Sequence, residues 1–393
     1  MRRIREAIGT FILTNLVIIV FIFTLYLCLE FFGIIQVPEE RSLVKFLYAK
    51  MDLAVSVVPG YVENTLKDTN LKEIINKDTN SIAVELDENT VTTVQLQENQ
   101  NENIKNSNNM VFRYYDQLEQ NAKIMYDALE SNKDKLKSGN HVFNFGTTFD
   151  ELLHQENGNE ILNQSFQLAV NSFSFDHPEI FYIDITKIYL LTEETTTPFS
   201  KTYRVSIGPN EASYLYEEYT SESDVNFAVN QVNQIKDSIK QNAQGSNYDK
   251  IKYVHDYLID ATEYEKNVET HNNYNIYGAM VQKKAVCEGY SKAYKFILDE
   301  LEIPCFIVCG TGQNSSGEIE SHAWNYVQLD NNLYAVDVTW DDPVIIGNGI
   351  ISNDFRYKYF LKGSDNFFDD HIEDGTIIET AKFTYPRLNN LDY

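Results

Sequence analysis

Residues 286–298 read Val-Cys-Glu-Gly-Tyr-Ser-Lys-Ala-Tyr-Lys-Phe-Ile-Leu. In this stretch Tyr290, Tyr294 and Ile297 recur at intervals of four and three, which predicts a helix that begins close to Cys287. A thiol at a helix N-terminus faces unpaired backbone N–H groups and the positive end of the helix dipole. Both favour a thiolate, and the same N–H groups can hold an oxyanion. The segment therefore predicts Cys287 as a nucleophile, with a packed thiol as the alternative.

A hairpin is predicted further along the chain. Residues 321–340 read as two strands joined by a two-residue turn at Asp330 and Asn331. In that register Asp337 lies diagonal to His322 on the same face, and diagonal Cβ atoms are roughly 7–8 Å apart. The spacing therefore predicts an Asp–His hydrogen bond. A turn one residue longer without a bulge would send Asp337 to the opposite face, so the prediction depends on the register.

Cysteine, histidine and aspartate in this chain order have a direct chemical interpretation. Cys287 would attack an acyl carbon, His322 would hold the thiol proton and later protonate the leaving amine, and Asp337 would orient the imidazole. The alternative is three unconnected residues: a packed thiol, a strand-edge histidine and an aspartate that faces a turn.

Three segments resemble the signature blocks of the bacterial transglutaminase-like superfamily: Ala285-Val-Cys-Glu-Gly-Tyr-Ser-Lys-Ala293, His322-Ala-Trp-Asn325 and Asp337-Val-Thr-Trp-Asp-Asp-Pro343. The resemblance covers about residues 248–345. It implies a papain-like core, in which a helix with the cysteine packs on an antiparallel sheet with the histidine and aspartate. It also implies the roles of nucleophile, base and orienting residue for Cys287, His322 and Asp337. The superfamily includes transglutaminases, cysteine proteases, amidases and non-catalytic members, so the resemblance leaves the substrate open.

Further residues near these blocks are candidates for substrate binding. Gln282 lies five residues before Cys287 and could donate to an oxyanion, with a surface glutamine as the alternative. Trp324 and Trp340, the only two tryptophans, could line an acyl-binding cleft or fill the core. Asp341 and the next aspartate are interpreted as a solvated turn. We expect no metal and no cofactor.

Residues 7–29 are predicted to form a membrane anchor. Three arginines among the first six residues precede this run of 23 residues, which has no charged side chain. As a helix it would be about 34 Å long, against a hydrocarbon core of roughly 30 Å. The bulky residues before Cys28 fit neither a signal-peptidase site nor a lipoprotein cysteine, and a signal peptide cut after Gly33 is the alternative. The positive-inside rule places the N-terminus in the cytoplasm. The sequence therefore predicts a single-pass protein of the cell membrane, with its C-terminal part extracytoplasmic.

Composition limits the partners. The 58 Asp and Glu residues against 32 Lys and Arg give a net charge of −26, which argues against nucleic acid binding. Four cysteines without a CxxC pair argue against a disulfide-stapled miniprotein and a structural zinc site. We expect a protein or cell-wall peptide as substrate, and the membrane as a partner through the N-terminal helix.

The chain is predicted to have four parts: a cytoplasmic tail and transmembrane anchor (1–37), a stalk with an Asn-rich linker (38–109), an α+β domain of unknown role (110–243) and a transglutaminase-like catalytic domain (244–393). The predicted fold class is α+β. Helices are expected from Val111, from Ser221 and from Tyr248, and residues 179–185 are expected to form a strand.

These features predict a membrane-anchored thiol enzyme that forms a thioester with a substrate amide. Water would then give hydrolysis, as in a protease or amidase, and an amine would give a crosslink. The sequence marks no lysine-binding slot, which slightly favours hydrolysis. Two alternatives stay open: a non-catalytic binding or scaffolding module of the cell envelope that uses the same fold, and a zymogen-like arrangement in which residues 38–109 cover the cleft.

Overall fold

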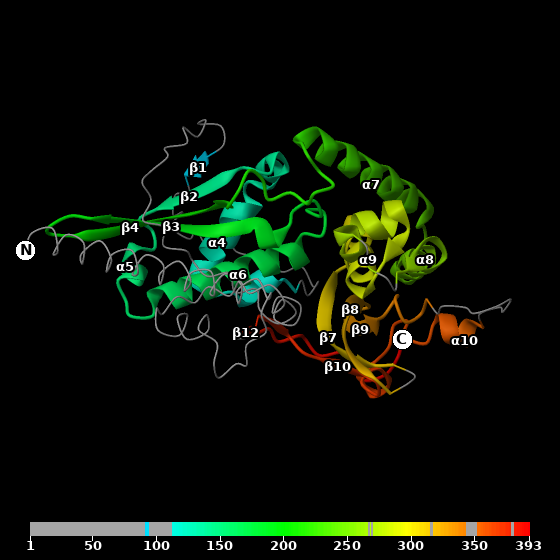
Figure 1. Cartoon of the computed structure of the whole chain (residues 1–393). Coiled ribbons are helices and arrows are strands. Elements are labelled where there is room, and N and C mark those ends of the chain that lie inside the picture. Colours follow the sequence, from blue (N-terminus) through cyan, green and yellow to red (C-terminus); the bar gives the residue numbers. More distant parts are fainter. Residues whose placement is uncertain are drawn as a thin grey trace, which may run out of the picture. The chain divides into compact units, whose positions relative to one another are not determined.

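The computed structural model of the chain (Figure 1) describes residues 91–93, 112–265, 268, 270–314, 317–342, 352–378 and 381–393. These residues all belong to one compact unit, Ala83–Tyr393. None of the helices found in the described ranges is both long and apolar enough to cross a membrane. The predicted anchor at 7–29 and the Asn-rich linker lie outside the described residues, so both stay predictions.

The first part of the described chain combines helices with one four-stranded sheet. The sheet has the order β1-β2-β4-β3, in which β1 is parallel to β2 and the other pairs are antiparallel. Its strands are β1 (Val91–Thr93), β2 (Val142–Gly146), β3 (Ile188–Thr196) and β4 (Lys201–Pro209). The helices are η3 (Tyr114–Gln117), α4 (Gln120–Glu130), η4 (Lys133–Ser138), α5 (Asp150–Leu153), α6 (Gly158–Asp176) and η5 (Ile185–Lys187). Figure 1 shows α4 and α6 running alongside the sheet.

Two sequence-based predictions differ from the structure in this part. The helix predicted from Val111 is split into η3 and α4, because Glu119 is extended and its carboxylate accepts two backbone N–H groups of the first turn of α4. The strand predicted over 179–185 is wrong. Only Ile183 makes an isolated bridge, and the Asp184 side chain caps the short helix η5 that follows.

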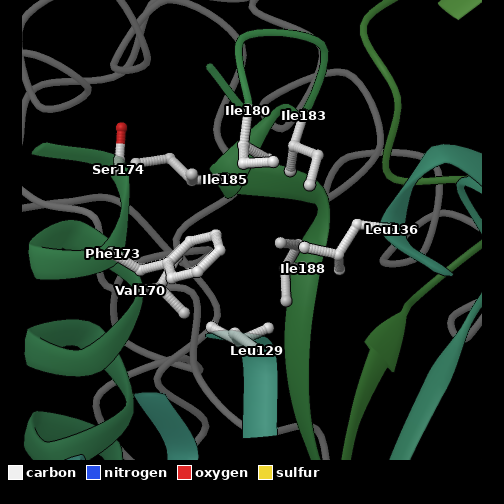
Figure 2. A pocket seen from close by; sticks show the side chains of 9 residues that line it. All are labelled: Leu129, Leu136, Val170, Phe173, Ser174, Ile180, Ile183, Ile185 and Ile188. Atoms are coloured by element: carbon white, nitrogen blue, oxygen red, sulfur yellow. The ribbon is translucent and has the colours of Figure 1, made fainter. Parts of the chain in front are cut away.

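A small apolar cavity lies between α4, α6 and the start of β3 (Figure 2). It measures about 20 Å³, which is close to the space that one water molecule needs. Its walls are aliphatic and aromatic apart from one serine, and consist of Leu129, Leu136, Val170, Phe173, Ser174, Ile180, Ile183, Ile185 and Ile188. A cavity this small and apolar is a packing defect of the core, not a ligand site.

Truncation of Leu129 beside this cavity is expected to be costly. Leu129 is 1% exposed, and Leu129→Ala would enlarge an existing void, so we expect a loss of about 3–5 kcal/mol in the free energy of unfolding. Chemical denaturation of the two proteins measures this difference. Phe199→Ala is the control, because Phe199 is 98% exposed and its truncation should change stability by less than about 0.5 kcal/mol. A loss below about 1 kcal/mol in Leu129→Ala would contradict the packing described.

Two long helices follow at the predicted positions. They are α7 (Glu222–Asn242) and α8 (Asn247–Ala261), and the side chains of Ser221 and Ser246 cap their N-termini. Four short elements lead from α8 to the next helix: β5 (Glu263–Tyr264), η6 (His271–Tyr274), the π-helix η7 (Gly278–Gln282) and β6 (Lys284–Ala285).

The helix α9 (Cys287–Glu300) precedes a second antiparallel sheet of order β10-β7-β8-β9. Its strands are β7 (Cys305–Gln313), β8 (Ile319–Leu329), β9 (Asn332–Val336) and β10 (His371–Glu373). The remaining elements are α10 (Asn353–Arg356), α11 (Ser364–Phe367), β11 (Thr376–Ile378) and β12 (Ala381–Lys382). Figure 1 shows α9 beside α8 and β8.

Buried hydrogen bonds attach α9 to this sheet. The Ser291 hydroxyl donates to the backbone carbonyl of Ala323 at 3.0 Å, and the Asn325 side chain donates to the carbonyl of Ser291 at 3.0 Å. Both partners of Ser291 lie on β8, so α9 is held against the strand that contains His322. A helix that begins at the cysteine and packs on an antiparallel sheet is confirmed.

The β8–β9 hairpin has the register that the sequence predicts. Leu329 pairs with Asn332, and the turn between them consists of Asp330 and Asn331. These two residues have positive φ angles of 49° and 66°, as in the two-residue hairpin turns that match the twist of the strands. Asp and Asn tolerate this conformation better than most residues. The turn chemistry thus sets which face of β9 meets β8.

Candidate active site

Cys287 is the first residue of α9 and is partly exposed. Val286 before it is extended and supplies no side-chain cap to the N–H groups of the first turn. The backbone N–H of Val286 donates to the carbonyl of Asn273 at 2.9 Å. A Cβ at position 289 would lie 2.5 Å from that same carbonyl oxygen, so only glycine permits this approach. The packing fixes where the helix starts and where the thiol lies.

His322 and Asp337 meet across the hairpin. His322 lies on β8, and Asp337 follows directly after the last residue of β9. His322 Nε2 and Asp337 Oδ2 are 2.7 Å apart. The histidine is 6% exposed and the aspartate is fully buried. The Asp–His hydrogen bond expected from strand spacing is therefore present.

The Asp337 carboxylate is held on both oxygens. Its Oδ1 accepts the backbone N–H groups of Thr339 and Trp340 at 3.0 and 3.2 Å. Burial alone would raise the pKa of Asp337, but the charges and hydrogen bonds of His322 and His371 outweigh it and hold that pKa well below its usual range. Asp337 is therefore an ionised acceptor at neutral pH.

The Cys287 thiol is one of the groups that set the pKa of His322. Burial lowers the pKa of His322, but the Asp337 charge, the bond to Asp337 and the hydrogen bond with Cys287 together raise it to about 10. The bond to Asp337 uses Nε2, which leaves Nδ1 for the thiol. The structure thus joins His322 to the buried Asp337 and places the partly exposed Cys287 at the start of α9 as the candidate nucleophile.

The sequence of this region matches a known family. Residues 233–338 match the model of the transglutaminase-like superfamily. The chain contains a transglutaminase-like domain. The matched span includes the cysteine, histidine and aspartate described above. No curated protein sequence matches the chain.

The chain is also similar in part to solved structures. One is a TGase, 16% identical with a TM-score of 0.27, and the similarity covers 56% of each chain. Another is the periplasmic domain of TgpA from Pseudomonas aeruginosa bound to ethylmercury, 16% identical with a TM-score of 0.23, which covers 36% of this chain and 56% of that one. The chain thus spans 56% of the length of each, and neither likeness is close enough to indicate an activity or a substrate.

The two tryptophans near His322 occupy different environments. Trp324 is fully buried and packs against Phe367 and His371, which favours the core-filling alternative for this residue. Trp340 is only partly buried, and its ring stacks on His322 with 4.7 Å between ring centroids. Of the two, Trp340 is the one placed to contact a substrate beside His322. Its predicted binding role stays a prediction.

Gln282, the third predicted substrate-binding residue, is exposed at the end of η7. No hydrogen bond among the described residues links its side chain to Cys287 or His322, so the structure does not bring it into the cluster. A role for Gln282 in binding an oxyanion stays a prediction. The N–H groups at the start of α9 are the donors that the structure places beside the thiol.

The segment after Asp337 is not the solvated turn that its two adjacent acids suggested. Asp341 is fully buried, where it bonds to His255 Nε2 at 3.1 Å and accepts the backbone N–H of Tyr359 at 2.8 Å. Asp342 accepts the hydroxyl of Tyr290, a residue of α9, at 2.6 Å. The two acids therefore tie the segment to α8 and α9 and hold Asp337 behind His322.

His371 is part of the site and was missed by sequence reasoning. It lies on β10, is fully buried, and its Nε2 is 3.2 Å from Asp337 Oδ2. No motif or periodic pattern marks His371, because it lies 34 residues after Asp337 in the chain. It reaches Asp337 only because β10 pairs with β7.

Two imidazoles and a carboxylate are also side chains that can act as metal ligands. The donor atoms of His322, Asp337 and His371 lie within 4.8 Å of one another. Both nitrogens, however, stand at hydrogen-bonding distance from the same carboxylate oxygen, 2.7 and 3.2 Å. A metal ion bound here would have to replace these hydrogen bonds.

Proposed function

We propose that this protein is a membrane-anchored, extracytoplasmic thiol enzyme that transfers the acyl group of a protein or cell-wall peptide amide through a thioester on Cys287. The observation that supports this most is the 2.7 Å contact between the His322 imidazole and the buried Asp337 carboxylate, in a domain whose candidate nucleophile Cys287 begins a helix. A thiol at a helix N-terminus, paired with an oriented imidazole, is the arrangement that nucleophilic acyl transfer requires.

The first half-reaction forms the thioester. His322 holds the proton of the Cys287 thiol, and Sγ attacks the amide carbon while the carbonyl electron pair moves to oxygen. The resulting oxyanion is stabilised by the N–H groups at the start of α9. When the oxyanion collapses, the C–N bond breaks, and His322 gives its proton to the leaving amine. Asp337 keeps its negative charge throughout and stabilises the imidazolium.

The second half-reaction releases the acyl group. A water molecule attacks the thioester carbon and gives its proton to His322, and collapse then breaks the C–S bond. The products are a carboxylic acid and the regenerated thiol. A primary amine that takes the place of water gives a new amide bond instead. Hydrolysis is the favoured outcome, because the sequence marks no slot for a lysine side chain.

The cellular setting rests on the sequence. The uncharged run at 7–29 after three arginines supports an anchor with a cytoplasmic N-terminus. Labelling of intact cells with a membrane-impermeant maleimide tests the side of the membrane. We expect Cys287 to be labelled without lysis, whereas labelling only after lysis would contradict an extracytoplasmic domain.

The activity is tested with the full chain in detergent. Casein and glutamine-containing peptides serve as amide substrates, with and without cadaverine as a primary amine. We expect mass spectrometry after acid quenching to find an acyl group on Cys287, and the product to carry a carboxylate. A cadaverine adduct as the main product would establish transamidation instead. No acyl-enzyme and no turnover, with Cys287 as reactive as an ordinary free thiol, would contradict the proposal and favour a binding module.

A further inference from the structure

His371 stands on the far side of Asp337 from His322. Both imidazoles approach the same oxygen, Oδ2, His322 at 2.7 Å and His371 at 3.2 Å. The other oxygen already accepts the N–H groups of Thr339 and Trp340. A carboxylate offers about four lone-pair sites, so His371 completes the set and leaves Asp337 no free direction in which to turn.

The opposite nitrogen of His371 is also engaged. Its Nδ1 is 2.8 Å from Asp370 Oδ1. The second oxygen of Asp370 accepts the hydroxyl of Tyr359 at 2.7 Å, and the Lys358 ammonium lies 3.4 Å from it. Bonds to Tyr359 and His371 keep the pKa of Asp370 below its usual value, although burial opposes this. Ionised carboxylates only accept hydrogen bonds, so each nitrogen of His371 faces an acceptor.

Packing fixes the plane of the His371 ring. The residue is fully buried, and its ring stacks on Phe367 with 4.1 Å between centroids and 23° between planes. The Trp340 ring lies 4.5 Å away on another side. The backbone is held as well, because His371 pairs with Gly312 in the β10–β7 ladder. A buried ring with both nitrogens bonded and its faces covered has one orientation.

We infer that His371 is a positioning residue of this site, and that the Asp370–His371 pair fixes the Asp337 carboxylate so that it orients His322 for chemistry at Cys287. The inference rests on the proposed function. The series of hydrogen bonds runs from Asp370 through His371 and Asp337 to His322, the residue proposed to act on the thiol. Its chemical role is to hold the acceptor oxygen in place, since a loosely held carboxylate would let the imidazole turn away from the sulfur.

A matched pair of substitutions distinguishes the loss of the hydrogen-bond donor to Asp337 from the loss of the volume of the ring. The amide nitrogen of glutamine reaches the place of a histidine Nε2, so His371→Gln keeps a donor for Asp337. The amide nitrogen of asparagine lies near the place of Nδ1, so His371→Asn keeps a donor for Asp370 and loses the one for Asp337. Asp370→Ala is the third variant, and it is the safest for folding because the Asp370 side chain is 24% exposed.

Two rates are measured with the full chain: amide turnover, and alkylation of Cys287 by iodoacetamide at pH 7, which needs no substrate. In His371→Asn we expect kcat to fall roughly 10- to 100-fold, by analogy with the loss of a group that orients a metal-ligating histidine from behind. KM should stay within about twofold, because His371 is buried and does not touch the substrate. Alkylation should slow in the same variant, His371→Gln should restore both rates, and Asp370→Ala should show a smaller loss.

Each outcome bears on the inference. Equal losses in the Gln and Asn variants would mean that the ring only fills space, and would overturn it. Wild-type rates in a folded His371→Asn variant would also overturn the inference. If that variant does not fold, wild-type rates in Asp370→Ala would overturn it. Failure of the proposed function is recognised separately: Cys287 of the wild type would then be alkylated no faster than in His322→Ala, and no amide would be turned over.

Discussion

Cys287→Ala is expected to abolish amide turnover by the full chain, with a loss of roughly 10⁴-fold or more. The sulfur forms the only bond to the acyl group in the proposed reaction, and residues that act as a unit lose nearly all of their effect when one is removed. Release of product from an amide substrate measures the change, and the acyl adduct on residue 287 should vanish with it. The fold should persist, because the residue is partly exposed at a helix start.

Cys309→Ala is the matched control. Burial raises the pKa of the Cys309 thiol to about 12, so this sulfur stays protonated at neutral pH and reacts slowly with iodoacetamide. We expect the control to keep the activity and the alkylation rate of the wild type. Turnover that survives in Cys287→Ala, or an acyl group found on Cys309, would refute the assignment of the nucleophile.

Asp337→Asn is expected to lower kcat by roughly 10³- to 10⁴-fold while the geometry of the hairpin persists. The neutral amide of asparagine cannot stabilise the His322 imidazolium. If its NH2 group takes the place of Oδ2, it also offers a donor where His322 and His371 now meet an acceptor. The effect should be largest at alkaline pH. In the wild type the pKa of His322 is about 10, so the protonated ring survives through neutral pH. Without the carboxylate, burial dominates and the ring loses its proton at lower pH, so the alkaline limb of the activity profile should move toward neutrality.

The same pair sets a pH window for stability. The pKa of His322 is raised in the folded protein, so its contribution is fully present below the usual value of 6.5 and is lost as the pH rises toward about 10. The pKa of Asp337 is depressed, so its contribution is present above the usual value of 3.8 and is lost as the pH falls below it. Denaturation at several pH values should show both slopes in the wild type and a flatter profile in Asp337→Asn.

Asp330→Asn is the control for this variant. Asp330 lies in the exposed turn of the same hairpin, where asparagine also tolerates its positive φ of 49°. We expect wild-type kcat and an unchanged pH profile. If Asp337→Asn matched this control, the carboxylate would have no role in orienting His322.

Local patterns predict the parts of the site that neighbouring residues build. The helix that begins at Cys287 follows from the three-and-four spacing of its apolar side chains, and the register of the hairpin follows from the turn at Asp330 and Asn331. The hairpin register in turn predicts that His322 and Asp337 meet, which the folded chain confirms. The same reasoning fails over 179–185, where strand-like residues form turns because the Asp184 side chain caps η5.

The helix start, the hairpin register and the contact between His322 and Asp337 can all be derived from the amino-acid sequence, because each depends on the residues of one helix or one strand pair. The burial of Asp341 against His255 and the place of His371 behind Asp337 emerge only when the whole chain is folded. Those contacts join segments tens of residues apart, and they form because β10 pairs with β7 and α8 packs near the end of the hairpin. Such pairings depend on which surfaces the whole chain buries together, and no short-range pattern encodes them.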